Sequence, residues 1–404
     1  MSTVLSPGNV SRRPRPTRQP RRLNLAVACV LLAGLAACTT PAPPVVPTSF
    51  AEYQSRTLAE LRATRAFQSA DHERELVWNG PREWRPAGPT RRGVLLVHGL
   101  GDSPWSFHDI GEQLAAQGFL VRTVLLDGHG SRPEHLLDVS LGDWQRVVAT
   151  QVATLRADVD QVYLGGFSTG ANLAVHRAYA GDDVDGLLLF SPAFRSDNAY
   201  DWLTPWIRWV RPWLRTPDGS RPVQNAVRYL TVPTNGFAQF YRSSRQVLQD
   251  LAQAPYDKPT LMVVAEHDSV IDTGALADTF HTRFTHPASR LIWYGNAPIQ
   301  ARHDPRILVR PDRLPDWRIS QFSHMGVLFS PDNPLYGRGG SLRICWNGQA
   351  QPPRADCAAD ETLWFSDWGY QEPGKVHARL TFNPYFSWQG EVMAEVLAAQ
   401  GTAP

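Results

Sequence analysis

The chain has 404 residues, of which 43% are hydrophobic and 19% are charged. That length gives enough core for one large α/β domain or two smaller ones, and the composition excludes wholesale disorder. The formal net charge of +2 includes six arginines before residue 23, so removal of that segment leaves +2 − 6 = −4, which excludes a basic nucleic-acid-binding protein.

The N-terminal segment predicts an export signal rather than part of a fold. Arginines without any acidic residue precede an apolar run over residues 25–37, which is shorter than the roughly 20 residues of a membrane span. The run ends in Leu35-Ala36-Ala37-Cys38, which resembles the lipobox of bacterial lipoprotein signal peptides. The alternatives are an ordinary secretory signal with an incidental cysteine and a short membrane anchor.

The lipobox resemblance implies a mature protein that is anchored to a membrane. Residues 1–37 would be the signal peptide, Cys38 would carry the lipid, and the proline-rich residues 38–49 would form an extended tether. Thr39 stands where an aspartate is associated with retention in the inner membrane. We therefore expect a lipoprotein of a bacterial cell envelope, on its periplasmic or outer-membrane face.

Two of the four cysteines lie outside the export segment and the lipidation position. Cys345 and Cys357 are twelve residues apart, within a predicted surface excursion over residues 337–380. In an exported protein such a pair most simply forms one disulfide, and a zinc site would need further ligands that are not found beside it. We expect the disulfide.

Apolar runs and helical spacing alternate between residues 50 and 193, which predicts the first part of an α/β core. The predicted elements are a helix over 50–64, strands over 76–78, 83–85, 93–97 and 119–126, a helix over 141–157, and strands over 162–165 and 186–190. Several of these strands are apolar throughout, which is typical of a parallel sheet covered by helices on both faces. We predict a doubly wound, mostly parallel sheet.

The alternation returns over residues 257–404, which predicts the second part of the core. The predicted elements are a strand over 259–265, a helix from 273, a last central strand over 290–294, a polar, proline-rich insertion over 296–317, and an amphipathic helix over 387–400.

Residues 194–256 interrupt the alternation, and we predict a helical cap there, between the sixth and seventh strands. The segment contains four tryptophans spaced 4, 3 and 4, namely Trp202, Trp206, Trp209 and Trp213. That spacing would place the rings on one helical face, although Pro205 and Pro212 favour short or kinked helices. The face either packs on the core or, for part of its rings, lines an acyl pocket or rests on a lipid surface.

The pentapeptide Gly166-Phe167-Ser168-Thr169-Gly170 lies between the strand over 162–165 and a helical stretch over 171–180. Strand, Gly-x-Ser-x-Gly and helix in this order predict a nucleophile elbow. The tight turn strains the serine backbone, and side chains two residues to either side would collide, so both positions need glycine. We expect Ser168 to be a nucleophile above the sheet edge, with helix N–H groups facing developing negative charge.

A second turn of the site follows the strand over 93–97, in His98-Gly99-Leu100-Gly101-Asp102. Such a loop presents a backbone N–H to an oxyanion, so we predict Leu100 N–H and Thr169 N–H as the two donors. The alternative is a plain strand-to-helix loop. His129, in the turn after the strand over 119–126, is expected to shape the loop beneath the site rather than to act in catalysis.

The third member of a catalytic triad is expected just after the strand over 259–265. Asp268 is placed best, with Asp272 as the second candidate and Glu266 as the third. For each of them the alternative is a surface acid that caps the next helix.

His324 is the predicted general base. Ser323-His324 has a turn-like setting that leaves an imidazole free to reach Ser168. His281 and His286 precede the last predicted central strand and are therefore too early, and His303 lies in the irregular insertion.

With Ser168, Asp268 and His324 in this order, the chain resembles the α/β-hydrolase superfamily, in the branch of monoacylglycerol lipases and bacterial carboxylesterases. The resemblance covers roughly residues 93–336. The elbow differs from the Gly-His-Ser-Met-Gly-Gly frequent in that branch, and the histidine follows an insertion, so the resemblance says less about substrate than about chemistry. It implies acyl transfer through a serine ester, with no metal or cofactor.

These observations lead to hypotheses from different classes. The first is a lipid-anchored esterase or lipase that acts on small acyl esters or on monoacylglycerol- or lysolipid-like substrates. The second keeps the triad in an envelope acyltransferase or thioesterase. The third is an inactive hydrolase that serves as a surface-binding lipoprotein.

Overall fold

The computed structural model of the chain describes residues 49–219, 222–345, 347–348, 357 and 362–398. The described residues all belong to one compact unit. The predicted signal peptide, Cys38 and the tether up to residue 48 lie outside the described residues, so those predictions stay untested. No helix within the described residues is both long and apolar enough to cross a bilayer.

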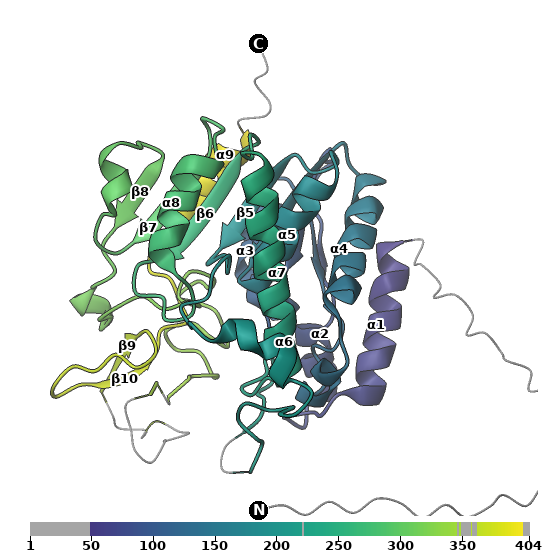
Figure 1. Cartoon of the computed structure of the whole chain (residues 1–404). Coiled ribbons are helices and arrows are strands. Elements are labelled where there is room, and N and C mark those ends of the chain that lie inside the picture. The colour runs from purple at the N-terminus through teal and green to yellow at the C-terminus, as the bar shows by residue number, and fades with distance from the viewer. Residues whose placement is uncertain (1–48, 220–221, 346, 349–356, 358–361, 399–404) are drawn as a thin grey trace, which may run out of the picture. The chain divides into compact units, whose positions relative to one another are not determined.

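An eight-stranded sheet runs through the middle of the described residues, with helices in front of it and behind it (Figure 1). In spatial order its strands are β1 (Glu83–Trp84), β3 (Leu120–Val124), β2 (Arg92–Val97), β4 (Gln161–Phe167), β5 (Gly186–Phe190), β6 (Thr260–Ala265), β7 (Arg290–Tyr294) and β8 (Ile307–Arg310). Only β1 is antiparallel to its neighbour. The prediction of a doubly wound, mostly parallel sheet is confirmed.

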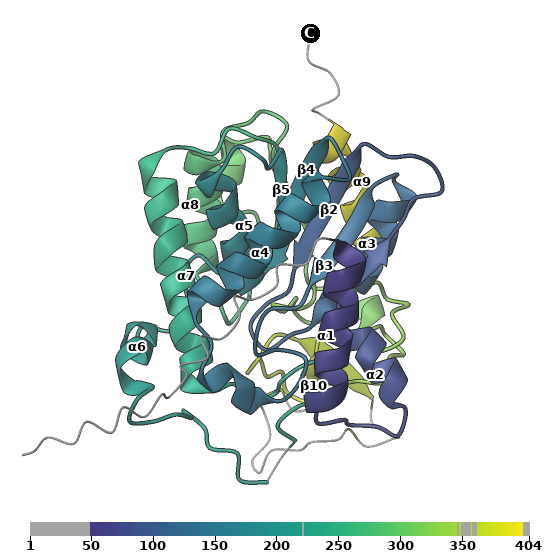
Figure 2. The same cartoon turned by 90° about the vertical axis from the view of Figure 1, so that its right-hand side faces the viewer.

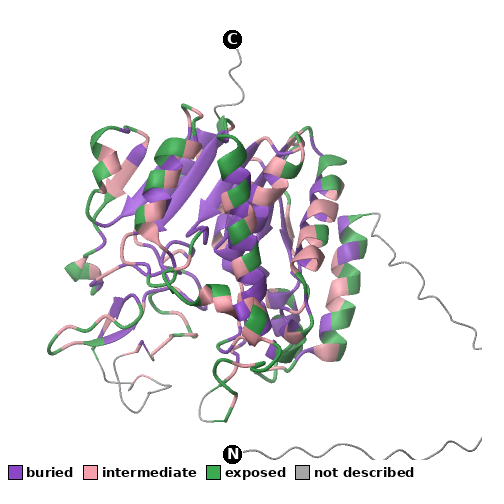
Figure 3. Ribbon diagram, viewed as in Figure 1, coloured by how far each residue is buried: buried purple, intermediate pink, exposed green. Residues whose placement is uncertain are grey.

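Alternation along the strands divides the core into two apolar layers. Leu95 and Val97 of β2 face one layer, and Val94 and Leu96 face the other. The first layer is covered by α4 (Leu141–Arg156), α5 (Thr169–Ala180), α7 (Thr234–Gln253) and α8 (Thr273–Arg283), and the second by α3 (His108–Ala116) and α9 (Phe386–Ala398). Figure 2 shows the two layers on opposite sides of the sheet, and Figure 3 shows the strands buried between them.

The N-terminal elements agree with the sequence in part. Helix α1 (Phe50–Thr64) has the predicted bounds, but the strand predicted over 76–78 is wrong, because these residues belong to α2 (His72–Asn79). The Asp71 side chain accepts a hydrogen bond from Arg74 N–H at 3.0 Å and caps this helix, and Leu76 packs against Leu61. The capping aspartate therefore indicates the secondary structure here better than the apolar run Leu76-Val77-Trp78, which suggested a strand.

Because the strand predicted over 76–78 is absent, each later strand has a number one lower than predicted. The segment predicted between the sixth and seventh strands lies between β5 and β6. The prediction that 290–294 is the last central strand is also wrong, because β8 extends the sheet from inside the insertion. Strand β8 is a partly exposed edge strand of four residues, and its apolar run of three residues is shorter than the runs that mark the inner strands.

The segment between β5 and β6 has two unlike halves. Its second half is α7, which packs against α5, and the helices that the structure describes in its first half are the short η3 (Asp201–Leu203) and α6 (Thr204–Ile207). The four tryptophans therefore do not share one helical face. Trp202, Trp206 and Trp209 are 51%, 74% and 75% exposed, so these rings do not pack on the core.

Short elements complete the described residues. The 3₁₀ turns are η1 (Pro104–Phe107), η2 (Pro133–Leu137), η4 (Ile299–Arg302) and η5 (Pro315–Trp317). In the predicted excursion, β9 (Leu363–Ser366) and β10 (Val376–Arg379) form a parallel pair. The structure joins Cys345 to Cys357 by a disulfide, with Cα atoms 5.3 Å apart. In both views β10 and α6 lie toward the lower end of the described residues (Figures 1 and 2).

Candidate active site

Ser168 occupies a sharp turn between β4 and α5. Its φ of 54° and ψ of −117° are rare for a residue with a side chain. A Cβ atom at Gly166 would lie 2.3 Å from the Gly170 carbonyl carbon, and one at Gly170 would lie 2.0 Å from Val97 O. The expected need for glycine at both positions is confirmed, and the strain at Ser168 is what a nucleophile elbow requires.

Asp268 and His324 are joined by a direct hydrogen bond. His324 Nδ1 lies 2.6 Å from Asp268 Oδ2, and both side chains are almost completely buried. The other oxygen of Asp268, Oδ1, accepts from Val270 N–H at 2.9 Å, which orients the carboxylate. With its Nδ1–H donated to this carboxylate, the imidazole presents Nε2 as a proton acceptor.

Backbone contacts connect the histidine segment to the elbow. The Ser191 hydroxyl, just after β5, donates to His324 O at 3.0 Å, and Ala193 N–H donates to Ser168 O at 3.4 Å. The Phe167 and His324 rings pack with centroids 4.8 Å apart. These contacts bring the three predicted triad residues to the same edge of the sheet.

The other acids and histidines have different partners. Asp272 accepts from Ala275 N–H at 3.0 Å and caps α8, while Glu266 accepts from Asn296 N–H at 2.6 Å. His281 pairs with Asp304 at 3.0 Å, and His303 is exposed at the end of η4. Of the three candidate acids, the structure therefore places Asp268 against His324.

The loop after β2 contacts the elbow directly. A Cβ atom at Gly99 would lie 3.0 Å from Phe167 Cδ1 and 3.2 Å from Phe167 O, so the two turns touch. Within the part of the chain that the structure describes, neither Leu100 N–H nor Thr169 N–H donates to a backbone acceptor. Two unpaired donors on adjoining turns are what an oxyanion hole needs.

Two buried histidines support these turns from below. His98 Nδ1–H donates to Gly99 O at 2.8 Å, and its Nε2 accepts from Leu126 N–H at 3.1 Å. Burial lowers the pKa of His98 to about 4, so the ring is neutral at neutral pH. Burial also lowers the pKa of His129, which packs against His98 with ring centroids 4.8 Å apart. Neither ring contacts Ser168, and both shape the loops beneath it.

Sequence reasoning missed two positioning residues. Ser191 has a φ of 41° and is fully buried, and its contact with His324 joins positions 133 residues apart. Asp367 accepts from the N–H of Ser269, the residue after Asp268, at 3.0 Å, and burial raises the pKa of Asp367. The only local signal was a serine directly after a buried strand, in Ser191-Pro192.

Comparison with known proteins places this site in a family. A family model described as serine aminopeptidase, S33 matches residues 88–298, just over half of the chain. The thermostable monoacylglycerol lipase of Bacillus sp. (strain H-257) is 26% identical over 188 residues, which cover 45% of this chain and 72% of that protein. A monoglyceride lipase homolog of Monkeypox virus is 26% identical over 118 residues, covering 28% of this chain and 43% of that protein.

Solved structures include two with similar arrangements. A soluble variant of monoglyceride lipase from Saccharomyces cerevisiae has a TM-score of 0.44 and 16% identity, with 54% of this chain and 82% of that chain covered. The Paleococcus ferrophilus monoacylglycerol lipase has a TM-score of 0.44 and 17% identity, with 56% and 91% covered. The chain belongs to the serine aminopeptidase, S33 family, and it is a serine hydrolase with the α/β-hydrolase fold.

Proposed function

We propose that this protein hydrolyses carboxylic esters through a covalent acyl-enzyme on Ser168. The observation that carries the proposal is the 2.6 Å contact between His324 Nδ1 and Asp268 Oδ2, beside a serine strained at φ 54°. A carboxylate on Nδ1–H directs Nε2 toward the serine as its proton acceptor. Strain at the serine supports a role in chemistry, because a turn without that role would relieve it with glycine.

In the proposed reaction, His324 Nε2 takes the proton of Ser168 Oγ as Oγ attacks the ester carbonyl carbon. Asp268 stabilises the imidazolium, and the N–H groups of Leu100 and Thr169 donate to the oxyanion. Loss of one comparable donor raises the barrier by ~2.7–4 kcal/mol. His324 then protonates the leaving alcohol, and water cleaves the acyl-enzyme by the same steps.

We infer a substrate with an apolar acyl chain, such as a monoacylglycerol or a lysolipid. Two relatives have lipase names. The exposed tryptophans of residues 200–214 also suit a lipid–water interface, because an indole ring combines a large apolar body with one polar N–H. We further propose that Cys38 carries a lipid and anchors the enzyme in a bacterial cell envelope. Release of a Cys38→Ala variant from membranes tests the anchor.

Fluorophosphonate labelling of the chain from Thr39 onward tests the nucleophile, with p-nitrophenyl acyl esters of several lengths as substrates. Labelling and ester hydrolysis are expected in the wild type, and both should be lost in Ser168→Ala and His324→Ala. His303→Ala is the matched control, because His303 is exposed and outside the proposed triad. A folded wild type that neither labels nor cleaves any ester would contradict the proposal and favour a binding lipoprotein.

Product analysis separates ester hydrolysis from the related reactions. With a competing alcohol present, a hydrolase yields mainly free acid, whereas an acyltransferase yields a new ester. Acyl thioesters test the thioesterase alternative. Because the matching family model is described as a serine aminopeptidase, an alanine p-nitroanilide should be included. Cleavage of that amide without any ester cleavage would replace the esterase proposal.

A further inference from the structure

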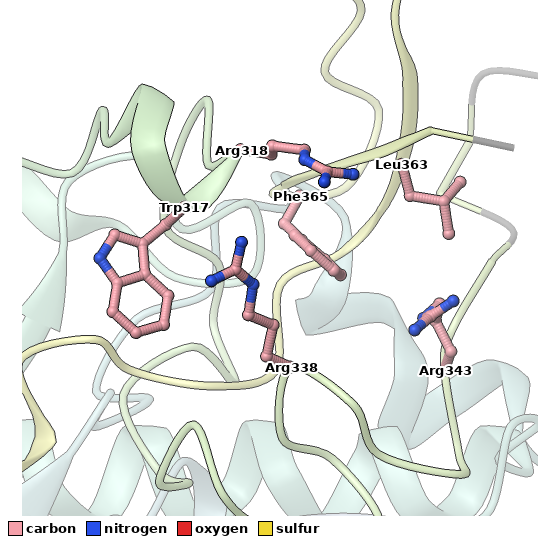
Figure 4. Close-up of a pocket in the computed structure, with 6 residues that line it drawn as sticks. All are labelled: Trp317, Arg318, Arg338, Arg343, Leu363 and Phe365. Carbon is pink, nitrogen blue, oxygen red and sulfur yellow. The ribbon is translucent and has the colours of Figure 1, made fainter.

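A small cavity beside β9 is lined by three arginines and three apolar side chains. Of the described residues, those lining this cavity of about 120 Å³ are Trp317, Arg318, Arg338, Arg343, Leu363 and Phe365. None of the predicted triad residues lines it, so it is separate from the candidate active site. In the view of Figure 4, the guanidinium group of Arg318 lies above Phe365, that of Arg338 lies to the left of Phe365, and that of Arg343 lies below Leu363.

These arginines lack the acidic partners that nearby cations have. Arg313 pairs with Glu372 at 3.0 Å, and Lys375 pairs with the same carboxylate at 2.6 Å. For the three cavity arginines, the described residues supply no carboxylate within 4.0 Å. Arg338 instead lies over the Trp317 ring, with Cζ 5.0 Å from its centroid. Three positive charges therefore meet at one cavity without protein counter-charges among these residues.

The floor of the cavity is apolar and firmly attached to the core. Leu363 and Phe365 are both buried and, as alternate residues of β9, lie on the same face of that strand. Phe365 N–H donates to Arg318 O at 2.7 Å, and Phe365 O accepts from Ser320 N–H at 2.8 Å. The three arginines around this floor are exposed to solvent, and the apolar floor keeps water from one side of an anion held between them, which strengthens its attraction to the guanidinium groups.

Arg318 has a backbone conformation that favours glycine. Its φ of 55° and ψ of 39° lie in the left-handed region. Glycine would relieve this strain, and residues that retain such strain are concentrated at functional sites. An arginine at this position therefore points to a use for its guanidinium at the cavity.

We propose that this cavity binds a phosphate group. The planar guanidinium of arginine matches two phosphate oxygens at once, and three such groups suit a doubly charged anion better than a single carboxylate. The cavity is smaller than the roughly 300–1,000 Å³ of sites for drug-sized ligands, so the charged group alone fits inside it. The phosphate is either a free anion or the headgroup of an anionic phospholipid, and binding is reversible.

Calorimetric titration of inorganic phosphate into the chain from Thr39 onward tests the site. Wild type should bind phosphate in preference to acetate, and Arg338→Gln with Arg343→Gln should weaken binding by about tenfold or more, as expected for lost charge-assisted hydrogen bonds. Arg302→Gln is the matched control, because Arg302 is exposed on η4 and does not line the cavity. Acetate binding as tight as phosphate binding would overturn the assignment.

The Arg318→Gly variant distinguishes a loss of phosphate binding from a loss of folding. Because glycine adopts φ 55° without strain, this variant should keep or raise its melting temperature while its phosphate affinity falls. Affinity equal to that of wild type in a folded Arg318→Gly would overturn the proposal.

Sedimentation with vesicles distinguishes the two sources of the phosphate. Vesicles of phosphatidylglycerol and phosphatidylcholine in equal parts are compared with vesicles of phosphatidylcholine alone. Binding to the anionic vesicles that is lost in the Arg338→Gln, Arg343→Gln variant supports a lipid headgroup. If wild type binds inorganic phosphate, and the Arg338→Gln, Arg343→Gln variant binds the anionic vesicles as well as wild type does, the ligand is a free anion. Wild type that binds neither inorganic phosphate nor the anionic vesicles overturns the proposal.

Discussion

The elbow around Ser168 and residues 200–214, the tryptophan segment, both follow strands of the central sheet, but they differ in how their side chains are fixed. At the elbow the backbones are in such close contact that a Cβ atom at Gly170 would lie 2.0 Å from Val97 O. In residues 200–214, Trp206 and Trp209 are 74% and 75% exposed. The elbow is therefore tightly packed against neighbouring backbone, whereas residues 200–214 expose their largest side chains to solvent.

This difference separates the residues of the proposed chemistry from those of the proposed interface. Ser168 and His324 are positioned by hydrogen bonds with β5 and the residues just after it, Asp268 by one with Val270 N–H, and the loop after β2 packs against the elbow. Small changes near them should therefore cost activity, stability or both. Changes in the tryptophan segment should leave the fold intact and alter only what it contacts.

The sharpest test within the catalytic region compares two acids four residues apart. Asp268→Asn should lower kcat by about 10⁴-fold, because the side-chain NH2 that replaces Oδ2 donates to His324 Nδ1, and the resulting tautomer has its proton on Nε2 and cannot accept one from Ser168. Asp272→Asn should keep wild-type kcat, since Asp272 caps α8 and asparagine is also a good cap. Hydrolysis of p-nitrophenyl butyrate measures both. Equal losses in the two variants would contradict the assignment of the acid.

A second test compares two glycines. Gly170→Ala should destabilise the fold by about 3 kcal/mol or more, because the new methyl group collides with Val97 O and His98 O. Gly142→Ala is the matched control, because its Cβ would meet only Arg146 Nη1 at 3.6 Å and Ser140 Oγ at 3.7 Å, and alanine favours a helix. Urea unfolding of both variants measures the difference. A Gly170→Ala variant as stable as wild type would show that the turns are looser than described.

The buried His98 predicts a pH dependence of stability. Its pKa is about 4 in the folded state, against about 6.5 when unfolded, so between these values only the unfolded chain binds the proton. The contribution of neutral His98 is therefore complete above pH 6.5 and is lost as the pH falls toward 4, by up to about 3 kcal/mol.

A His98→Gln variant isolates this contribution. The difference in unfolding free energy between wild type and variant should shrink as the pH falls from 7 to 4. Asp109, whose pKa burial raises to about 6, acts in the opposite direction but is present in both proteins. Stability curves that stay parallel across this range would contradict the prediction.

The parts of the site that sequence could predict are those with local causes. Strand, Gly-x-Ser-x-Gly and helix lie within one short stretch, and the reason for each glycine is a collision inside that same turn or with the strand beside it. Buried parallel strands are visible as apolar runs. Helix α2 was missed because its cap, Asp71, lies before the apolar run that suggested a strand.

Other features depend on distant contacts and could not be read from the chain. Ser191 bonds to His324 across 133 residues, and Asp367 accepts from Ser269 across 98. The left-handed backbone of Arg318 follows a turn whose sequence, Pro-Asp-Trp-Arg, does not demand it. The exposure of the tryptophans could likewise not be predicted, because the same helical spacing occurs on a buried helix face and on one that lies at an interface.

The smallest effect on the fold is expected in the tryptophan segment. Trp206→Ser with Trp209→Ser should change the unfolding free energy by less than about 0.5 kcal/mol, because both rings are exposed. The same variant should bind phospholipid vesicles more weakly and lose activity on emulsified esters, but keep activity on soluble p-nitrophenyl butyrate. Ile299→Ser is the matched control, since Ile299 is 66% exposed on η4, outside this segment. Equal loss on soluble and emulsified esters would assign the tryptophans to the acyl pocket instead, because a pocket acts on every substrate, whereas an interface matters only for substrates in an aggregate.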